Sequence, residues 1–271
     1  MTVDGLIPAL SAVIQAFFLV VGVYIYVSLL RQIAVRPPNA EIPPARTFGL
    51  PEAVIAILLT SFFLLTLAGA STHNVSRMRS VDLVASGALT IGLLLAVAGF
   101  LRLRRFDLNL IGGFSRIGFS RTVITGGIFI LAAYPLIILA DVVTQRLLQS
   151  TPQRQAIVEM FSESTTLDQR ILIIFLAVSL APFAEEFIFR FFIYGVARRY
   201  FGRFIGVIVS SLLFAAVHAH LPSFAPLFVL GSCLAIAYEW SGSILVSMTM
   251  HALFNATTLT FLAFPEFVQQ Q

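Results

Sequence analysis

The sequence contains no lysine, because all 17 of its basic residues are arginine. This absence excludes enzymes that use a lysine as a Schiff base, as a nucleophile or as the phosphate-binding residue of a Walker motif. The single cysteine, Cys233, excludes an intrachain disulfide and a metal site built on paired cysteines. Charged residues are only 11% of the chain, against roughly a quarter in an average soluble domain, so an ordinary soluble globule is excluded as well.

Apolar residues make up 58% of the chain, with 26 phenylalanines and a mean hydropathy of +0.95. Disordered and nucleic-acid-binding chains are poor in aromatic residues and rich in charge, so we expect no nucleic-acid partner. The formal charge of +4 is explained by loop arginines that hold orientation in a bilayer. The composition therefore predicts a polytopic membrane protein whose surroundings are the lipid bilayer.

Long apolar runs support this prediction. A bilayer core about 30 Å thick needs about 20 apolar residues in a helix. Eight candidate spans fit, at about Leu6–Leu30, Leu50–Ser71, Val81–Leu103, Thr122–Val143, Ile171–Ala197, Phe204–Leu221, Phe224–Trp240 and Ile244–Phe264. We therefore predict an all-α transmembrane helix bundle of about eight spans.

The arginines also indicate an orientation. With the N-terminus outside, the inner loops carry 11 arginines and the outer loops carry five. Because positive charge accumulates on the cytoplasmic side, we expect both chain ends outside and a multi-pass protein of the plasma membrane.

Most of the 13 acidic residues lie outside the runs or near their ends, where helix caps and headgroups are expected to satisfy them. Glu52, Asp82, Asp141 and Glu239 are in this group.

Three charges in the middle of the fifth run are the exceptions: Glu185, Glu186 and Arg190. A charge near the bilayer centre costs about 2.5 to 3.5 kcal/mol, so these three require compensation. Glu186 and Arg190 are four residues apart and are expected to pair on one helical face. Glu185 points about 100° away, without a partner in its helix, and we expect it to be functional. Pro182 frees a backbone carbonyl where the acids begin, as is tolerated at membrane depth beside a cavity.

Two later runs carry polar side chains at helical spacing. FAAVH places Phe214 and His218 four residues apart, and HALFN does the same for His251 and Asn255. We expect the three helices to bring Glu185, His218, His251 and Asn255 to one cavity, with Phe214 in a packing role. His220 is expected to be a hydrogen-bonding residue of the helix packing.

One acid, two imidazoles and an amide are the parts of a water-activating hydrolase, in which a carboxylate deprotonates water and neutral donors stabilise an oxyanion. Glu185, His218 and His251 would also suit a zinc site with one carboxylate and two histidines. The residues alone do not choose between bare water and a metal. The HExxH, GxGD and GxSxG signatures of other proteases are missing.

EEFIFR, FAAVH and HALFN, in this order, resemble the EExxxR, FxxxH and HxxxN/D motifs of the CPBP or Abi family. These are the CAAX prenyl endopeptidases of the Ras-converting type and their bacterial relatives. The resemblance covers about Ile171 to Phe264. It implies that Glu185 activates water with the help of His218, that His251 and Asn255 stabilise the oxyanion, and that Glu186 and Arg190 support them.

The resemblance also implies a membrane-associated or lipid-modified protein or peptide as substrate. The family has carried the label metallopeptidase, while its better-understood members are similar to metal-independent glutamate enzymes. The cofactor is thus either none or one divalent metal such as zinc.

We accordingly expect an intramembrane endopeptidase. Residues 122–271 would form its catalytic membrane domain, and residues 1–121 would supply the first transmembrane helices and an amphipathic connector. Two alternatives remain open: a proton-coupled transporter that relays protons through the glutamates and histidines, and a catalytically silent membrane scaffold. The chain has no paired interrupted helices in two similar halves, which disfavours a transporter.

Overall fold

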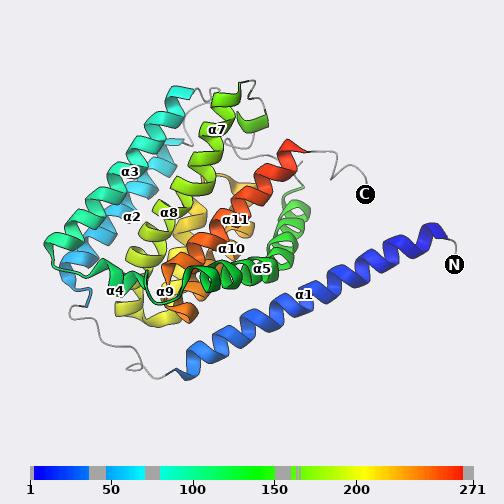
Figure 1. Cartoon of the computed structure of the whole chain (residues 1–271), viewed down its shortest axis with the longest axis horizontal. Helices are drawn as coiled ribbons and strands as arrows, with labels where there is room; N and C mark the ends of the chain where they lie inside the picture. Colours follow the sequence, from blue (N-terminus) through cyan, green and yellow to red (C-terminus); the bar gives the residue numbers. More distant parts are fainter. Residues whose placement is uncertain are drawn as a thin grey trace.

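A computed structural model describes residues 3–36, 47–70, 80–149, 160–162, 164 and 166–264. The regular structure within these ranges is helical throughout (Figure 1), which confirms the all-α prediction. The elements run in the order α1 (Val3–Val35), α2 (Leu50–Ala70), α3 (Ser80–Leu103), α4 (Leu108–Gly112), α5 (Phe119–Leu148), α7 (Leu167–Phe175), η1 (Leu176–Leu180), α8 (Ala181–Glu185), η2 (Glu186–Ile193), α9 (Tyr194–Val217), η3 (Leu221–Ser223), α10 (Phe224–Ser241) and α11 (Ile244–Ala263).

Seven helical segments in the described part of the chain are long and apolar enough to cross a membrane. One of them, Leu167–Val217, is 51 residues long and contains the fifth predicted span and most of the sixth. Its helix is interrupted at Gly202, where φ is 84° and ψ is 172°, a conformation that is essentially restricted to glycine. The chain turns back there, since a Cβ at Gly206 would lie 3.0 Å from the backbone nitrogen of Arg198. A polytopic bundle of about eight spans is therefore confirmed.

The helices of the C-terminal half pack around α10, which contacts α5, α9 and α11. The α2 and α3 helices lie together on the far side of α8 from α11 (Figure 1). The α1 helix lies along α5 and α10, and its N-terminal half extends beyond the bundle (Figure 1). The contact with α5 is close, because a Cβ on Gly22 would collide with the carbonyl oxygen of Ala132.

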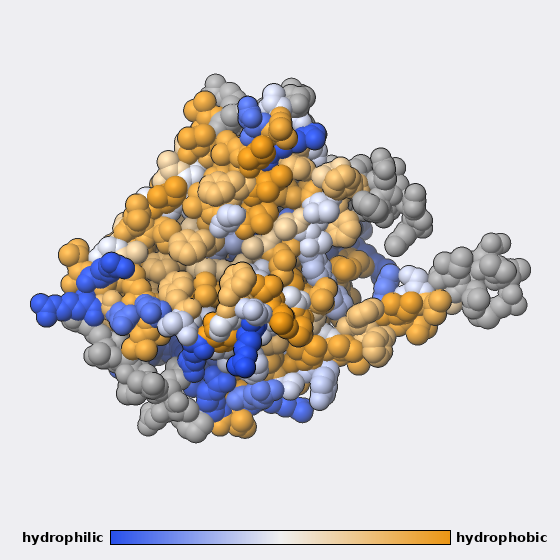
Figure 2. All heavy atoms as spheres, viewed as in Figure 1, coloured by the Kyte–Doolittle hydropathy of each residue, from blue (hydrophilic) through white to orange (hydrophobic). Residues whose placement is uncertain are grey.

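The exterior of the bundle is mostly apolar, as a membrane protein requires. Figure 2 shows hydrophobic residues over the middle of the molecule and hydrophilic residues gathered toward its margins. Leu65, Leu131 and Phe119 are among the large apolar side chains that are exposed on α2 and α5. Single exposed apolar residues are normal on any protein, but a continuous apolar surface of this kind fits a lipid environment.

Glu239, near the end of α10, corrects one expectation. The carboxylate was expected to be satisfied by a cap or by headgroups, but only 3% of Glu239 is exposed. Its oxygens pair with Arg198 at 2.8 Å and with Arg203 at 2.9 Å, and Tyr194 donates its hydroxyl to the same carboxylate. Sequence spacing gave no signal for this cluster, because Glu239 lies on α10 while its three partners lie on α9.

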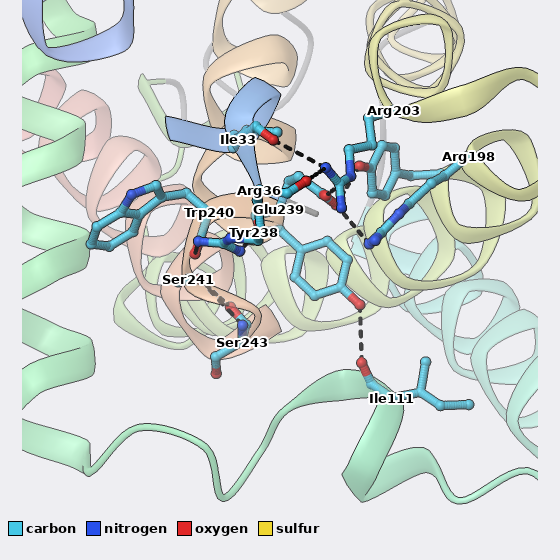
Figure 3. A network of polar contacts seen from close by, with 11 residues as sticks. Ile33, Arg36, Ile111, Arg198, Arg203, Tyr238, Glu239, Trp240, Ser241 and Ser243 are labelled. Atoms are coloured by element: carbon cyan, nitrogen blue, oxygen red, sulfur yellow. Dashed lines mark hydrogen bonds and ion pairs between the residues drawn. The ribbon is translucent and has the colours of Figure 1, made fainter. Parts of the chain in front are cut away.

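Arginines near Glu239 also cap the C-terminal ends of α1 and α10 (Figure 3). Arg203 donates to the carbonyls of Ile33 and Arg36 at the end of α1. Arg36 in turn donates to the carbonyls of Glu239 and Trp240 at the end of α10. A cation is favourable at a helix C-terminus because the last carbonyls lack intrahelical partners. This network fixes the end of α1 against α9 and α10.

Glu52 is satisfied at a helix start, as expected. Its carboxylate accepts the backbone N–H of Gly49 at 2.7 Å, in the manner of a capping box, and also pairs with Arg104 at 2.9 Å.

Candidate active site

The fifth predicted run becomes π-helical twice around the two glutamates. Leu176–Leu180 (η1) and Glu186–Ile193 (η2) are π-helical, and the five-residue α8 between them ends at Glu185. Wide turns of this kind are uncommon and occur frequently at functional sites.

Pro182 explains how the π-helical segment η1 is connected to α11. In η1 the N–H of Ala181 bonds to the carbonyl of Leu176, five residues back. The next carbonyl in that register is that of Ala177, whose partner would be residue 182, a proline without an N–H. Asn255 donates its side-chain Nδ2 to this carbonyl at 2.7 Å. A carbonyl freed by Pro182 was predicted; it is that of Ala177, and it holds Asn255.

Glu186 and Arg190 form the expected pair in the interior. Both side chains are fully buried, and Nη1 of Arg190 lies 3.0 Å from Oε1 of Glu186. Arg190 also donates to the carbonyl of Gly231 at 3.4 Å, and its Cζ lies 4.1 Å from the centroid of the Phe214 ring. The guanidinium thus has partners on η2, α10 and α9, which compensate its burial.

His251 lies between the two glutamates. Its Nδ1 is 2.9 Å from Oε1 of Glu186, and its Nε2 is 3.9 Å from Oε2 of Glu185. A carboxylate that is paired with Arg190 acts as a hydrogen-bond acceptor, so Nδ1 carries the hydrogen in this contact. The ring is thereby oriented with Nε2 toward Glu185.

His218 occupies the C-cap of α9. Its Nδ1 lies 2.7 Å from the carbonyl oxygen of Phe214, which can only accept, so Nδ1 is the donor and the neutral ring keeps Nε2 as an acceptor. The Phe214 ring packs against His218 with centroids 4.9 Å apart and against His251 with centroids 5.5 Å apart. Phe214 therefore has the packing role that was expected of it.

A cavity of about 540 Å³ is lined by Glu185, His218, His251 and Asn255, together with mostly apolar residues. Glu185 is the open member of the glutamate pair: its side chain is 27% exposed, and its Oε2 has no hydrogen-bond partner among the described residues. No direct hydrogen bond or ion pair joins Glu185 to His218 within the residues that the structure describes.

Several cavity residues were missed by the sequence reasoning. Tyr134 and Asp141 of α5 line the cavity, although Asp141 was expected to be satisfied by a cap or by headgroups. Asp141 instead accepts a hydrogen bond from Gln145 at 2.7 Å.

His220, which was expected to be a hydrogen-bonding residue, has its Nδ1 2.7 Å from the hydroxyl of Ser223.

The geometry also addresses the metal alternative. Within the described ranges, no group of three or more His, Cys, Asp or Glu side chains is arranged to hold a metal ion. Nδ1 of His251 is bonded to Glu186 and Nδ1 of His218 to a backbone carbonyl, so only Nε2 of each ring would be open to a metal. Among the described residues, Glu185, His218 and His251 are thus not arranged as a set of three that could hold a zinc ion.

Comparison with known proteins is informative for the second half of the chain. Residues 167–257 match the family described as type II CAAX prenyl endopeptidase, Rce1-like, whose members hydrolyse peptide bonds. The chain is also similar to the uncharacterized protein YpbD of Bacillus subtilis (strain 168), with 39% identity over 88 residues. That similarity covers 31% of this chain and 42% of YpbD, so it spans less than half of the relative.

No solved structure matches the chain. The family match contains Glu185, Glu186, Arg190, His218, His251 and Asn255. The chain is an integral, multi-pass membrane protein, and its residues 167–257 are similar to the Rce1-like type II CAAX prenyl endopeptidase family.

Proposed function

We propose that this protein is an intramembrane endopeptidase in which Glu185 activates a water molecule to hydrolyse a peptide bond. One observation carries the proposal: of two adjacent glutamates, Glu186 is buried and paired, while Glu185 opens into a cavity shared with His218, His251 and Asn255. A carboxylate whose nearest cationic group is an imidazole 3.9 Å away, with no arginine partner, has no evident structural use, and its placement suits a general base.

In the proposed reaction, a water molecule lies between Glu185 and His218. Glu185 removes one proton from this water, and the water oxygen forms a bond to the carbonyl carbon of the substrate. Nε2 of His218 accepts the second hydrogen of the water as a hydrogen bond and so orients it. When the tetrahedral intermediate collapses, the C–N bond breaks and the proton on Glu185 passes to the leaving nitrogen.

In this proposal, Asn255 and His251 stabilise the negative oxygen of this intermediate. The Asn255 amide has two N–H groups, and the bond to Ala177 uses one of them. The second is available to the oxyanion. Donation from Nε2 of His251 requires a proton on both ring nitrogens, because the Nδ1 hydrogen is already directed at Glu186. Glu186 and Arg190 hold His251 in place and do not contact the substrate in this proposal.

We further propose that the substrate is a membrane-associated protein or peptide and that the enzyme resides in the plasma membrane. The apolar cavity wall supports a substrate that enters from a membrane. A lipid-modified substrate is suggested by the family name alone. We also retain the division into residues 1–121 and 122–271 as a proposal about the organisation of the chain.

The test is cleavage of quenched apolar peptides by the purified protein in detergent, with the cleaved bond identified by mass spectrometry. Wild type is expected to cleave, and Glu185→Gln is expected to lose at least about a hundredfold in rate, as for removal of a general base. Asp168→Asn is the matched control, because Asp168 is exposed on α7 and does not line the cavity. Equal cleavage by wild type and Glu185→Gln would reject the proposal.

The same preparation separates the alternatives. Proton flux in reconstituted vesicles without cleavage would favour the transporter, and peptide binding without either would favour the scaffold. Cleavage that survives a chelator is expected from the arrangement of the donor atoms.

A further inference from the structure

Two walls of the cavity come from helices outside the family match. On α5 the lining residues are Tyr134, Ile137, Ile138 and Asp141, whose spacing places them on one helical face. On α3 the lining residues have the same spacing and are Leu83, Ser86, Gly87 and Thr90. Since the match covers residues 167–257, these walls are a part of the site that the family comparison does not assign.

Apart from its histidines, the described cavity wall carries charges of one sign only. Among the described lining residues, the carboxylates are Glu185 and Asp141, and no arginine is present. The histidines His218 and His251 are the other ionisable groups besides Tyr134. A negatively charged wall within low-dielectric surroundings favours a positively charged ligand group and disfavours a negative one.

Asp141 is available for such a group. The residue is half-buried, and its carboxylate accepts one hydrogen bond, from the neutral amide of Gln145. No described cation forms an ion pair with it. A carboxylate in an apolar wall is costly unless a cation compensates it, and here the cation would have to come from the ligand.

We propose that Asp141 determines specificity by selecting peptides that carry an arginine or lysine side chain near the cleaved bond. An acidic side chain at the same place is rejected. Glu185 activates the water that attacks the peptide bond, whereas Asp141 binds a substrate side chain at a separate point on the cavity wall. This inference rests on the proposed peptidase function, but it concerns binding and can be tested apart from hydrolysis.

The experiment uses matched apolar peptides that carry arginine, its neutral analogue citrulline, or glutamate, moved stepwise along three positions on each side of the cleaved bond. Cleavage is measured with the full chain in zwitterionic detergent, so that lipid charge does not contribute. At the best position, we expect the arginine peptide to exceed the citrulline peptide about tenfold in kcat/KM, the effect of one ion pair shielded from water.

Asp141→Asn is expected to reduce this preference below about twofold, through a higher KM for the arginine peptide. Asp141→Arg is expected to reverse the order in favour of the glutamate peptide, which a merely structural role of Asp141 would not produce. Asp168→Asn, an exposed acid outside the cavity, should keep the wild-type preference. An unchanged preference in Asp141→Asn, or no preference in wild type at any position, would overturn the proposal.

A binding measurement keeps the two proposals distinguishable. Fluorescence anisotropy of the same labelled peptides on Glu185→Gln protein should show the arginine preference, and the Asp141→Asn/Glu185→Gln variant should lose it. If wild type cleaves nothing but the binding preference holds, the peptidase proposal fails and the role of Asp141 stands. If cleavage depends on Glu185 while binding ignores Asp141, only the inference about Asp141 fails.

Discussion

Nδ1 of His251 lies 2.9 Å from Oε1 of Glu186, and the opposite edge of the same ring faces Glu185 at 3.9 Å. A single imidazole therefore separates two carboxylates that are neighbours in sequence. Glu186 is fully buried and bound on both sides, by His251 and by Arg190. Glu185 is left open to the cavity, which gives the two glutamates different physical roles.

Glu186→Gln is expected to destabilise the protein by about 3 to 5 kcal/mol, because Arg190 would remain buried without its counter-ion. Thermal unfolding of the purified protein in detergent measures this loss. The double variant Glu186→Gln/Arg190→Met should recover part of the stability, since it removes the stranded charge. An unfolding temperature for Glu186→Gln equal to that of wild type would mean that the pair is not compensating burial.

Pro182→Ala restores an N–H that can bond to the carbonyl of Ala177 and compete with Asn255 for it. We expect kcat to fall about tenfold with little change in KM, since the affected group acts on the intermediate.

A double-mutant cycle controls for a general effect on folding. If Pro182 acts through Asn255, then Pro182→Ala should add little to the loss already caused by Asn255→Ala. Fully additive losses would show that the proline acts by another route.

Gly22→Ala is expected to cost about 1 to 3 kcal/mol of stability, because the new Cβ would meet the backbone carbonyl of Ala132 on α5. Gly92→Ala on α3 is the matched control. A Cβ there would meet nothing within 4 Å, so this variant should gain up to about 1 kcal/mol from the reduced flexibility of the chain. Equal effects of the two substitutions on thermal unfolding would contradict the close packing of α1 on α5.

Glu239→Gln removes the carboxylate shared by Arg198 and Arg203, which are 29% and 17% exposed in their side chains. Because water partly screens both arginines, the expected loss is about 2 to 3 kcal/mol, less than for a fully buried pair. None of these three residues lines the cavity, so the kcat of the folded fraction should stay close to that of wild type. A variant with wild-type stability but lost catalysis would contradict this assignment.

The sequence was informative where a property depends on one helix. Hydropathy alone located the spans, and the spacing of four residues predicted the pairing of Glu186 with Arg190. The freed carbonyl near Pro182 was predicted as well, but the π register that selects Ala177 was not. Helix type at a proline depends on which neighbouring group can satisfy the exposed backbone, and here that group comes from α11.

The surroundings of single acidic residues depend on several helices and were not predictable. Glu239 and Asp141 looked alike in the sequence, as acids near helix ends, yet one is enclosed by arginines and the other lines the cavity. Their surroundings follow from packing, which hydropathy does not encode. The boundary between residues 121 and 122 stays a prediction, although α1 packs directly against α5 and α10.

The most direct measurement compares wild type and Glu185→Gln in two quantities: the rate constant of cleavage under single-turnover conditions, and the thermal stability. If Glu185 is the base that activates water, the variant should fold as stably as wild type and lose at least about a hundredfold in the rate of peptide-bond cleavage. A Glu185→Gln protein that is folded and cleaves within about twofold of the wild-type rate would contradict the account.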